Sequence, residues 1–198
     1  MSYKRSLGFL SPLVLGQMLA CAPGEKPSAQ PTPEVTANQV TGPGEGMVWH
    51  FGYGSNLSSR FLREHCPSVK PVMKAYLPNY RVEFRYYSNN RQGGISSIME
   101  APGEMTYGVI YEMPTKEMDD LDVLESVPEG LYTRETFLVL GEDGEWHEGD
   151  LYRVANPEGP FTPAASYLDL MIEGAREHGL DTDFLKKLEA MRRSLDES

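Results

Sequence analysis

One loop in this sequence has residues whose types and spacing could bind a reacting group. It is Tyr53-Gly54-Ser55-Asn56-Leu57, where a strand-like run meets a tight turn and the start of a helix. Glycine at such a junction lets backbone N–H groups approach a ligand closely, and a helix N-terminus favours an anion. An amino-acid carboxylate or a developing oxyanion would suit this loop. The alternative interpretation is an ordinary strand–helix turn with an Asx cap.

Glu125 is the side chain that could move a proton. It ends a helix that the sequence predicts over residues 115–125, with Thr115 as the cap. The residues that mark the apolar stripe of this helix are Met118, Leu121 and Leu124. Glu125 follows two of them by four and seven residues, so its carboxylate points toward the apolar side. Desolvation raises the pKa of such a carboxylate, which suits a general base. The alternative is a helix-end glutamate that pairs with Arg134 or faces solvent.

Most other familiar catalytic motifs are absent from the sequence. It contains no G-x-S-x-G elbow, no Walker loop, no H-E-x-x-H and no C-x-x-C. The four histidines lack metal-ligand spacing, and the neighbours His65 and Cys66 are more typical of a plain helix end than of half a zinc site. Two cysteines, Cys21 and Cys66, cannot build a disulfide scaffold.

Strands dominate the middle of the chain and helices its end. Strand-like runs occur at residues 47–53, 69–77, 80–87, 95–99, 105–113, 132–140 and 146–154. Helical patterns occur at residues 58–64, 115–125, 164–178 and 183–193. Asn56 or Ser58 would cap the first helix, and a turn or mobile loop covers residues 89–94. This order predicts an α+β domain and not a βαβ repeat.

Composition and charge narrow the class of protein. The chain has 198 residues, of which 40% are hydrophobic and 24% charged, enough for one domain with an attached tail. The net charge of −11 falls entirely on residues 47–198 and argues against a nucleic-acid partner. Fifteen prolines are too many for a helical bundle. Collagen, coiled coil and multi-span membrane proteins are excluded.

The start of the chain is typical of an export signal. Lys4 and Arg5 precede an apolar run over residues 7–20, which has the length of a signal-peptide core and is too short to span a bilayer. Residues 18–21 (MLAC) resemble a bacterial lipoprotein box, which implies cleavage before Cys21 and acylation of that cysteine. The alternatives are ordinary secretion and no export.

The segment after Cys21 has the composition of a tether. Residues 22–46 are rich in Pro, Gly, Ser and Thr and contain no aromatic residue, Leu, Ile or Met. We therefore expect a signal peptide over residues 1–20, a disordered tether over 21–46 and a folded domain over 47–198. This organisation predicts a lipid-anchored protein of the cell envelope, and Ala22 favours the outer membrane by resemblance to lipoproteins. Cys66 would then remain a free thiol.

The loop over residues 53–57 resembles the YGSNL signature of the gamma-glutamylcyclotransferase family. Further stretches that resemble the family follow in the same order, at residues 93–98, 102–104, 107–111, 121–125, 130–132, 163–167 and 174–180. The resemblance covers nearly all of the predicted domain. It implies a small mixed β-barrel with helices packed around it, in agreement with the α+β prediction.

Members of this family release 5-oxoproline from a γ-glutamyl compound when its α-amine attacks its own γ-carbonyl. The resemblance implies that Glu125 takes a proton from the α-ammonium and delivers it to the leaving amine. The substrate-contacting residues that it implies are His50, Phe51, Gly52, Tyr53, Gly54, Ser55, Asn56, Tyr132 and Tyr167. The two tyrosines after the loop would otherwise be core aromatics. No metal and no organic cofactor is implied.

Several points stay open at this stage. Ser126 follows Glu125 where the family usually has glycine, so the local backbone is not fixed by the resemblance. The substrate could be a γ-glutamyl amino acid, a γ-glutamyl amine or a peptidoglycan-like γ-linked fragment. The alternative function is a non-catalytic envelope lipoprotein that binds small γ-glutamyl or amino-acid ligands without turnover. The sequence contains no pattern that indicates an oligomeric state.

Overall fold

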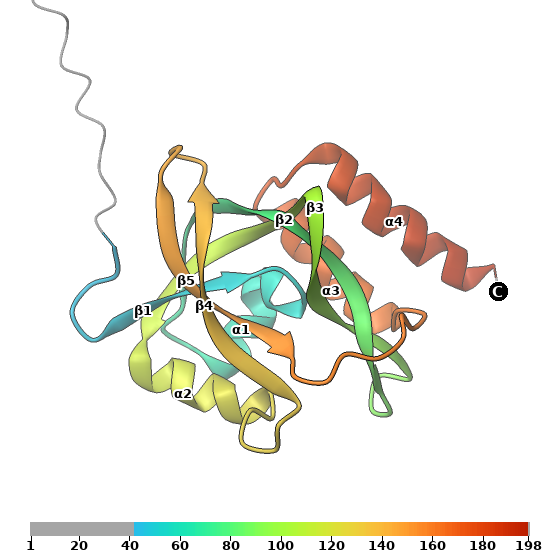
Figure 1. The fold of residues 1–198 in the computed structure, drawn as a ribbon, viewed down its shortest axis with the longest axis horizontal. Coiled ribbons are helices and arrows are strands. Elements are labelled where there is room, and N and C mark those ends of the chain that lie inside the picture. Colours follow the sequence, from blue (N-terminus) through green and yellow to red (C-terminus); the bar gives the residue numbers. More distant parts are fainter. Residues whose placement is uncertain (1–41, 198) are drawn as a thin grey trace, which may run out of the picture. The chain divides into compact units, whose positions relative to one another are not determined.

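A computed structural model describes residues 42–197 (Figure 1). The predicted signal peptide, the lipidation site Cys21 and nearly all of the predicted tether lie outside the described residues, so those features stay predictions. Among residues 42–197, no helix is both long and apolar enough to cross a membrane.

Five strands close into a barrel, which confirms the predicted mixed α+β architecture (Figure 1). The strands are β1 (Met47–Gly52), β2 (Lys70–Ser88), β3 (Gly93–Pro114), β4 (Tyr132–Gly141) and β5 (Trp146–Val154). Their order around the barrel is β1-β3-β2-β4-β5. All neighbouring pairs are antiparallel except β1 and β5, which run parallel and meet where His50 lies opposite Asp150.

The prediction of four separate strands over residues 69–113 was wrong, because they form the two long strands β2 and β3. Pairing is interrupted and not ended near Asn79, whose φ is 66°, and Gly103, whose φ is 86°. The Asn79 side chain accepts a hydrogen bond from the Gly103 backbone at 3.0 Å. Asn79 and Gly103 are turn-forming residues that make a bulge in the continuous pairing of β2 with β3. A sequence pattern does not distinguish such a bulge from the end of a strand.

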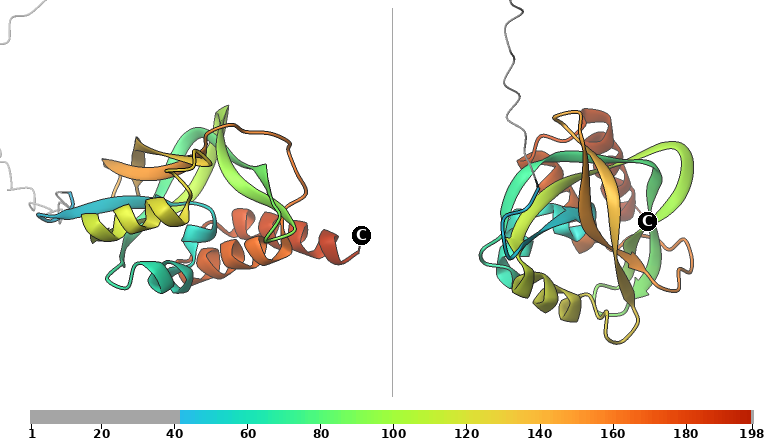
Figure 2. Two further views of the ribbon diagram at one scale, coloured as in Figure 1. Left: turned by 90° about the horizontal axis from the view of Figure 1, so that it is seen from below. Right: turned by 60° about the vertical axis from the view of Figure 1, so that its left-hand side comes forward.

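The helical elements are η1 (Ser55–Leu57), α1 (Ser59–His65), α2 (Thr115–Leu124), α3 (Ala165–Glu177) and α4 (Thr182–Asp196). Ser58 caps α1 as predicted, since its side chain accepts from Phe61 N. The prediction that Thr115 caps its helix was wrong: Pro114 is the N-cap, and the Thr115 hydroxyl donates to Gly46 O at 3.1 Å. Figure 2 shows α1, α3 and α4 gathered on one side of the barrel.

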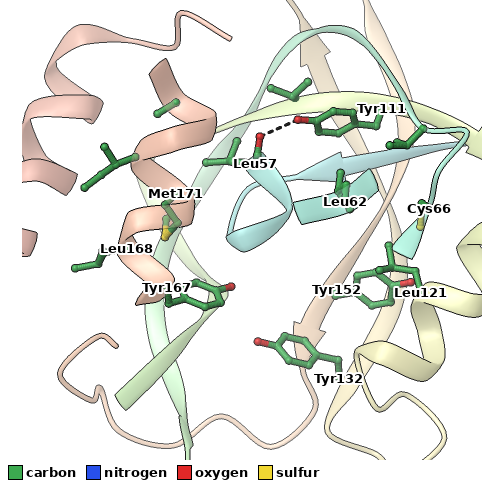
Figure 3. Close-up of a cluster of buried hydrophobic side chains, with 14 of the residues drawn as sticks. Leu57, Leu62, Cys66, Tyr111, Leu121, Tyr132, Tyr152, Tyr167, Leu168 and Met171 are labelled. Carbon is green, nitrogen blue, oxygen red and sulfur yellow. Dashed lines mark hydrogen bonds between the residues drawn. The ribbon is translucent and has the colours of Figure 1, made fainter. Parts of the chain in front are cut away.

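Two groups of buried side chains hold the domain together. One fills the barrel, with Phe51, Ile110 and Leu151 fully buried. The other lies between the barrel and the helices, and Figure 3 shows part of it. This second cluster fixes η1, because the Tyr111 hydroxyl donates to Leu57 O at 2.8 Å (Figure 3). Cys66 is buried and free, as expected.

Helix α3 packs directly against η1. A Cβ added at Gly174 would lie 2.2 Å from the carbonyl oxygen of Leu57, so only glycine allows this approach. Backbone therefore meets backbone below the loop, which leaves η1 little freedom to move. The 53–57 loop is thus held by β1 on one side and by α3 on the other.

Candidate active site

The 53–57 loop forms a single 3₁₀ turn and not the start of an α-helix, because α1 begins only at Ser59. Leu57 N donates to Gly54 O at 3.0 Å. Within residues 42–197, the backbone N–H groups of Gly54, Ser55 and Asn56 donate to no protein acceptor. These donors are available to a ligand.

Gly54 lies in close contact with Ser96 and Tyr167. A Cβ at this position would lie 2.4 Å from Ser96 Oγ and 2.5 Å from the Tyr167 hydroxyl. Those two hydroxyls are hydrogen-bonded to each other at 2.8 Å, and the Tyr132 hydroxyl donates to Ser96 O at 2.7 Å. Ser96 of β3 therefore joins the two predicted tyrosines, whose hydroxyls face one another in Figure 3.

Glu125 lies partly buried at the C-terminal end of α2. Its Oε1 accepts a hydrogen bond from Asn56 Nδ2 at 3.0 Å. Burial raises the pKa of Glu125 to about 7, although the Asn56 hydrogen bond and the positive charge of Arg91 act in the opposite direction. The alternative partner is engaged elsewhere, because Arg134 forms ion pairs with other carboxylates, those of Asp119, Asp122 and Asp150.

His50 determines how the Asn56 amide is oriented. His50 Nδ1 lies 2.9 Å from Asp150 O, a carbonyl that can only accept, so Nδ1 carries the proton. Burial lowers the pKa of His50 to about 4, which keeps the ring neutral at pH 7. Nε2 is then an acceptor, and Asn56 Nδ2 lies 3.3 Å from it.

The Asn56 amide therefore directs both of its N–H groups at protein acceptors, one on His50 and one on Glu125. Its Oδ1 is buried and has no partner among the described residues. A buried acceptor without a donor costs free energy, roughly 1–3 kcal/mol. Asn56 Oδ1 is thus an unsatisfied acceptor on a residue that lines the inner cavity.

The backbone after Glu125 settles the question that Ser126 raised. Ser126 has a φ of 53°, in the left-handed region that favours glycine. Its carbonyl accepts from Leu131 N at 3.0 Å, which closes the loop after α2. The serine therefore adopts a conformation that favours glycine, and Glu125 is hydrogen-bonded to Asn56 with this serine in place.

One small cavity, of about 20 Å³, brings together Glu125 and every predicted substrate-contacting residue. Its lining also includes two residues that sequence reasoning missed, Ser96 and Tyr152. The contributions differ, because the Phe51 ring packs inside the barrel. Tyr132 and Tyr167 belong to the buried core and also line the cavity. The two interpretations of these tyrosines, as core aromatics and as cavity-lining residues, are therefore compatible.

A wider outer cavity, of about 420 Å³, adjoins this inner one. The two share four lining residues, Ser55, Glu125, Tyr132 and Tyr167. Arg91 also lines the outer cavity, with its guanidinium 5.7 Å from the Phe61 ring and 5.5 Å from the Tyr167 ring. Sequence reasoning missed Arg91, which lies in a polar turn without periodic pattern. In the part of the chain that the structure describes, no group of His, Cys, Asp or Glu is suited to a metal ion.

Comparison with known proteins places this site in a family. The family model described as AIG2-like family matches residues 105–188. Human gamma-glutamylcyclotransferase is 30% identical to this chain over 156 residues, which cover 77% of this chain and 82% of the human protein. The chain belongs to the gamma-glutamylcyclotransferase family.

Further relatives agree with this assignment. Bovine gamma-glutamylcyclotransferase is 30% identical over 152 residues, covering 75% of this chain and 80% of the bovine protein. A solved structure titled gamma-glutamyl cyclotransferase superposes with a TM-score of 0.69 at 28% identity, covering 73% of this chain and 87% of that one. A Bacillus subtilis structure, YkqA, is 24% identical with a TM-score of 0.65, covers 75% of this chain and 55% of its own, and shows a shared fold.

Proposed function

We propose that this protein releases 5-oxoproline from a γ-glutamyl compound, with Glu125 as general acid and base. The observation that carries the proposal is a carboxylate with a pKa near 7, held by Asn56 in the same cavity as three free backbone N–H groups. A general base works best when its pKa lies near the working pH. Membership of the family supports the same chemistry.

The α-ammonium of the substrate must lose a proton before its nitrogen can attack. The α-amino group of the substrate is more basic than Glu125, so this transfer is uphill, and the raised pKa of Glu125, about 7, makes it less costly than transfer to an ordinary glutamate. Asn56 Oδ1 would orient the ammonium by accepting a second hydrogen, once a small shift of the amide exposes this buried atom to the cavity. The unpaired acceptor of the free protein thereby gains a donor.

The reaction balances without any further reactant. The α-nitrogen bonds to the γ-carbon, and the bond from that carbon to the leaving nitrogen breaks. The α-nitrogen gives up two protons in total. Glu125 passes one of them to the leaving nitrogen, which departs as a neutral amine, and the free amine then takes up the other and ends as an ammonium. Because the nucleophile and the carbonyl belong to one molecule, holding them in the attacking conformation gives much of the acceleration.

The free N–H groups of Gly54, Ser55 and Asn56 supply the remaining contacts. They suit the substrate α-carboxylate or the oxygen of the γ-carbonyl as it gains negative charge. Because η1 is fixed by Leu57 from below, these donors need no rearrangement when charge develops. Preorganised donors of this kind stabilise a transition state more than mobile ones.

The proposal is tested with the purified protein, a panel of γ-glutamyl dipeptides and γ-glutamyl amines, and mass-spectrometric detection of 5-oxoproline. Wild type should form the product, and Glu125→Gln should lower kcat by roughly 1,000-fold. Glu148→Gln is the matched control, since Glu148 is exposed on β5 and lines neither cavity.

Two outcomes would contradict the proposal. Ligand binding without product from wild type would leave a binding module in place of an enzyme. Equal turnover by wild type and Glu125→Gln would mean that another group moves the proton.

A further inference from the structure

Arg91 is an unpaired cation in an acidic protein. Other arginines, such as Arg60, Arg134 and Arg192, form ion pairs with carboxylates. The Arg91 guanidinium forms no ion pair and no hydrogen bond with any other residue of the described range 42–197. It is partly buried in the wall of the outer cavity.

Two aromatic rings hold the guanidinium in place. Phe61 of α1 and Tyr167 of α3 both lie within cation–π distance of it, at 5.7 and 5.5 Å. Such contacts engage the face of the guanidinium and leave its N–H edge free. The rings belong to helices fixed in the core, so the cation has a defined position although it belongs to a turn.

The positions of Glu125 and Arg91 determine which part of the substrate lies near Arg91. Under the proposed function, the γ-carbonyl lies beside Glu125, which lines both cavities. The reacting amine and the γ-carbonyl then contact Glu125 and the free N–H groups at the wall that the two cavities share, because the inner cavity alone is too small for the γ-glutamyl group. The leaving amine must then extend into the outer cavity, toward Arg91.

We propose that Arg91 binds a carboxylate on the leaving amine and makes the enzyme select γ-glutamyl amino acids over neutral γ-glutamyl amines. This assignment rests on the proposed function and concerns the other end of the substrate. Arginine suits the role because its N–H fork matches a carboxylate with two parallel hydrogen bonds. Arg91 is a specificity-determining residue on this view, and it takes no part in proton transfer.

A pair of substrates that differ only in the carboxylate tests the proposal. γ-Glutamyl-alanine carries the carboxylate, and γ-glutamyl-ethylamide is the same molecule without it. Wild type should prefer the alanine compound in kcat/KM by roughly 10- to 100-fold, the range of one charge-assisted contact. Arg91→Gln should lose that factor on the alanine compound and, at a pH above the acid limb set by Glu125, stay within about twofold of wild type on the ethylamide.

Two further variants separate charge, geometry and fold. Arg91→Lys keeps the charge without the fork, so its preference should be intermediate. Arg193→Gln removes the same charge from an exposed site on α4 and should change neither substrate. Thermal denaturation of each variant shows whether the turn still folds.

The outcomes that overturn the proposal are distinct from failure of the proposed function. Equal loss on both substrates in Arg91→Gln would make Arg91 an anchor of the turn, and a wild type without preference would remove the carboxylate site. If wild type turns over neither compound, the cyclotransferase function fails. Calorimetric binding of both compounds to Glu125→Gln, with and without Arg91→Gln, then still decides whether Arg91 binds the carboxylate.

Discussion

The inner and outer cavities share a wall but are built in opposite ways. The inner one is made of a backbone turn, short side chains and buried hydrogen bonds, and its His50–Asn56–Glu125 chain has one consistent set of protons. The outer one is lined by side chains of strands, helices and the exposed turn at residues 89–91, and the Arg91 guanidinium is held only by ring contacts. The first arrangement suits chemistry that tolerates no displacement, and the second suits recognition that can vary.

The largest effect should come from adding one carbon to the inner wall. In Gly54→Ala, the new Cβ would overlap Ser96 Oγ and the Tyr167 hydroxyl, and moving them breaks their hydrogen bond. We expect kcat/KM to fall by at least about 100-fold and the free energy of unfolding to fall by about 1–3 kcal/mol. Steady-state kinetics and denaturant titration measure the two effects.

Gly149→Ala is the control for that change, because a Cβ at Gly149 would meet the Phe51 side chain at an ordinary 3.5 Å. It should keep most of the activity. Full activity in Gly54→Ala would show that the inner wall is adaptable, and the contrast between the cavities would be lost.

The pH dependence tests whether the two cavities are electrically linked. Glu125 must be ionised to accept a proton, so kcat/KM for the neutral ethylamide should rise with pH through about 7. Arg91 lowers the pKa of Glu125, so Arg91→Gln should move this acid limb to higher pH. His50 stays neutral across the limb because its pKa is about 4.

Arg193→Gln removes the same charge at a distance and should leave the limb in place. If Arg91→Gln also leaves it in place, water in the outer cavity screens the guanidinium from Glu125. Arg91 would then act on the substrate alone.

Most residues of the inner cavity were predicted, from the 53–57 loop, from Glu125 and from the family resemblance. The outer cavity was not predicted. The 53–57 loop is contiguous, and helical spacing from Met118 and Leu121, both buried, predicted the direction of Glu125. The third residue of the predicted apolar stripe, Leu124, is exposed, so that part of the prediction was wrong. Ser96 escaped notice because its role depends on Tyr167, 71 residues later in the chain. Arg91 escaped because a polar turn gives no pattern from which a side chain's direction follows.

The fold shows the same limit. Strand positions and the α+β class follow from local patterns, which packing then reinforces. The continuity of β2 and β3 does not, because whether Asn79 and Gly103 end a strand or bulge it depends on the partner strand. Thr115 has the residue type of a cap, yet the chain enters that helix one residue earlier, through Pro114.

The smallest effect concerns Ser126, which connects Glu125 to the exposed loop after α2. Ser126 keeps a φ of 53°, a conformation that costs a non-glycine residue roughly 1–2 kcal/mol. Ser126→Gly should relieve this cost, less what glycine loses in the unfolded chain, and so raise the free energy of unfolding by about 0.5–1 kcal/mol. Activity should stay within about twofold because Glu125 already has its position, and denaturant titration beside kinetics measures both. A variant that gained activity and not stability would mean that the serine displaces Glu125, and that the inner cavity is less rigid than its hydrogen bonds indicate.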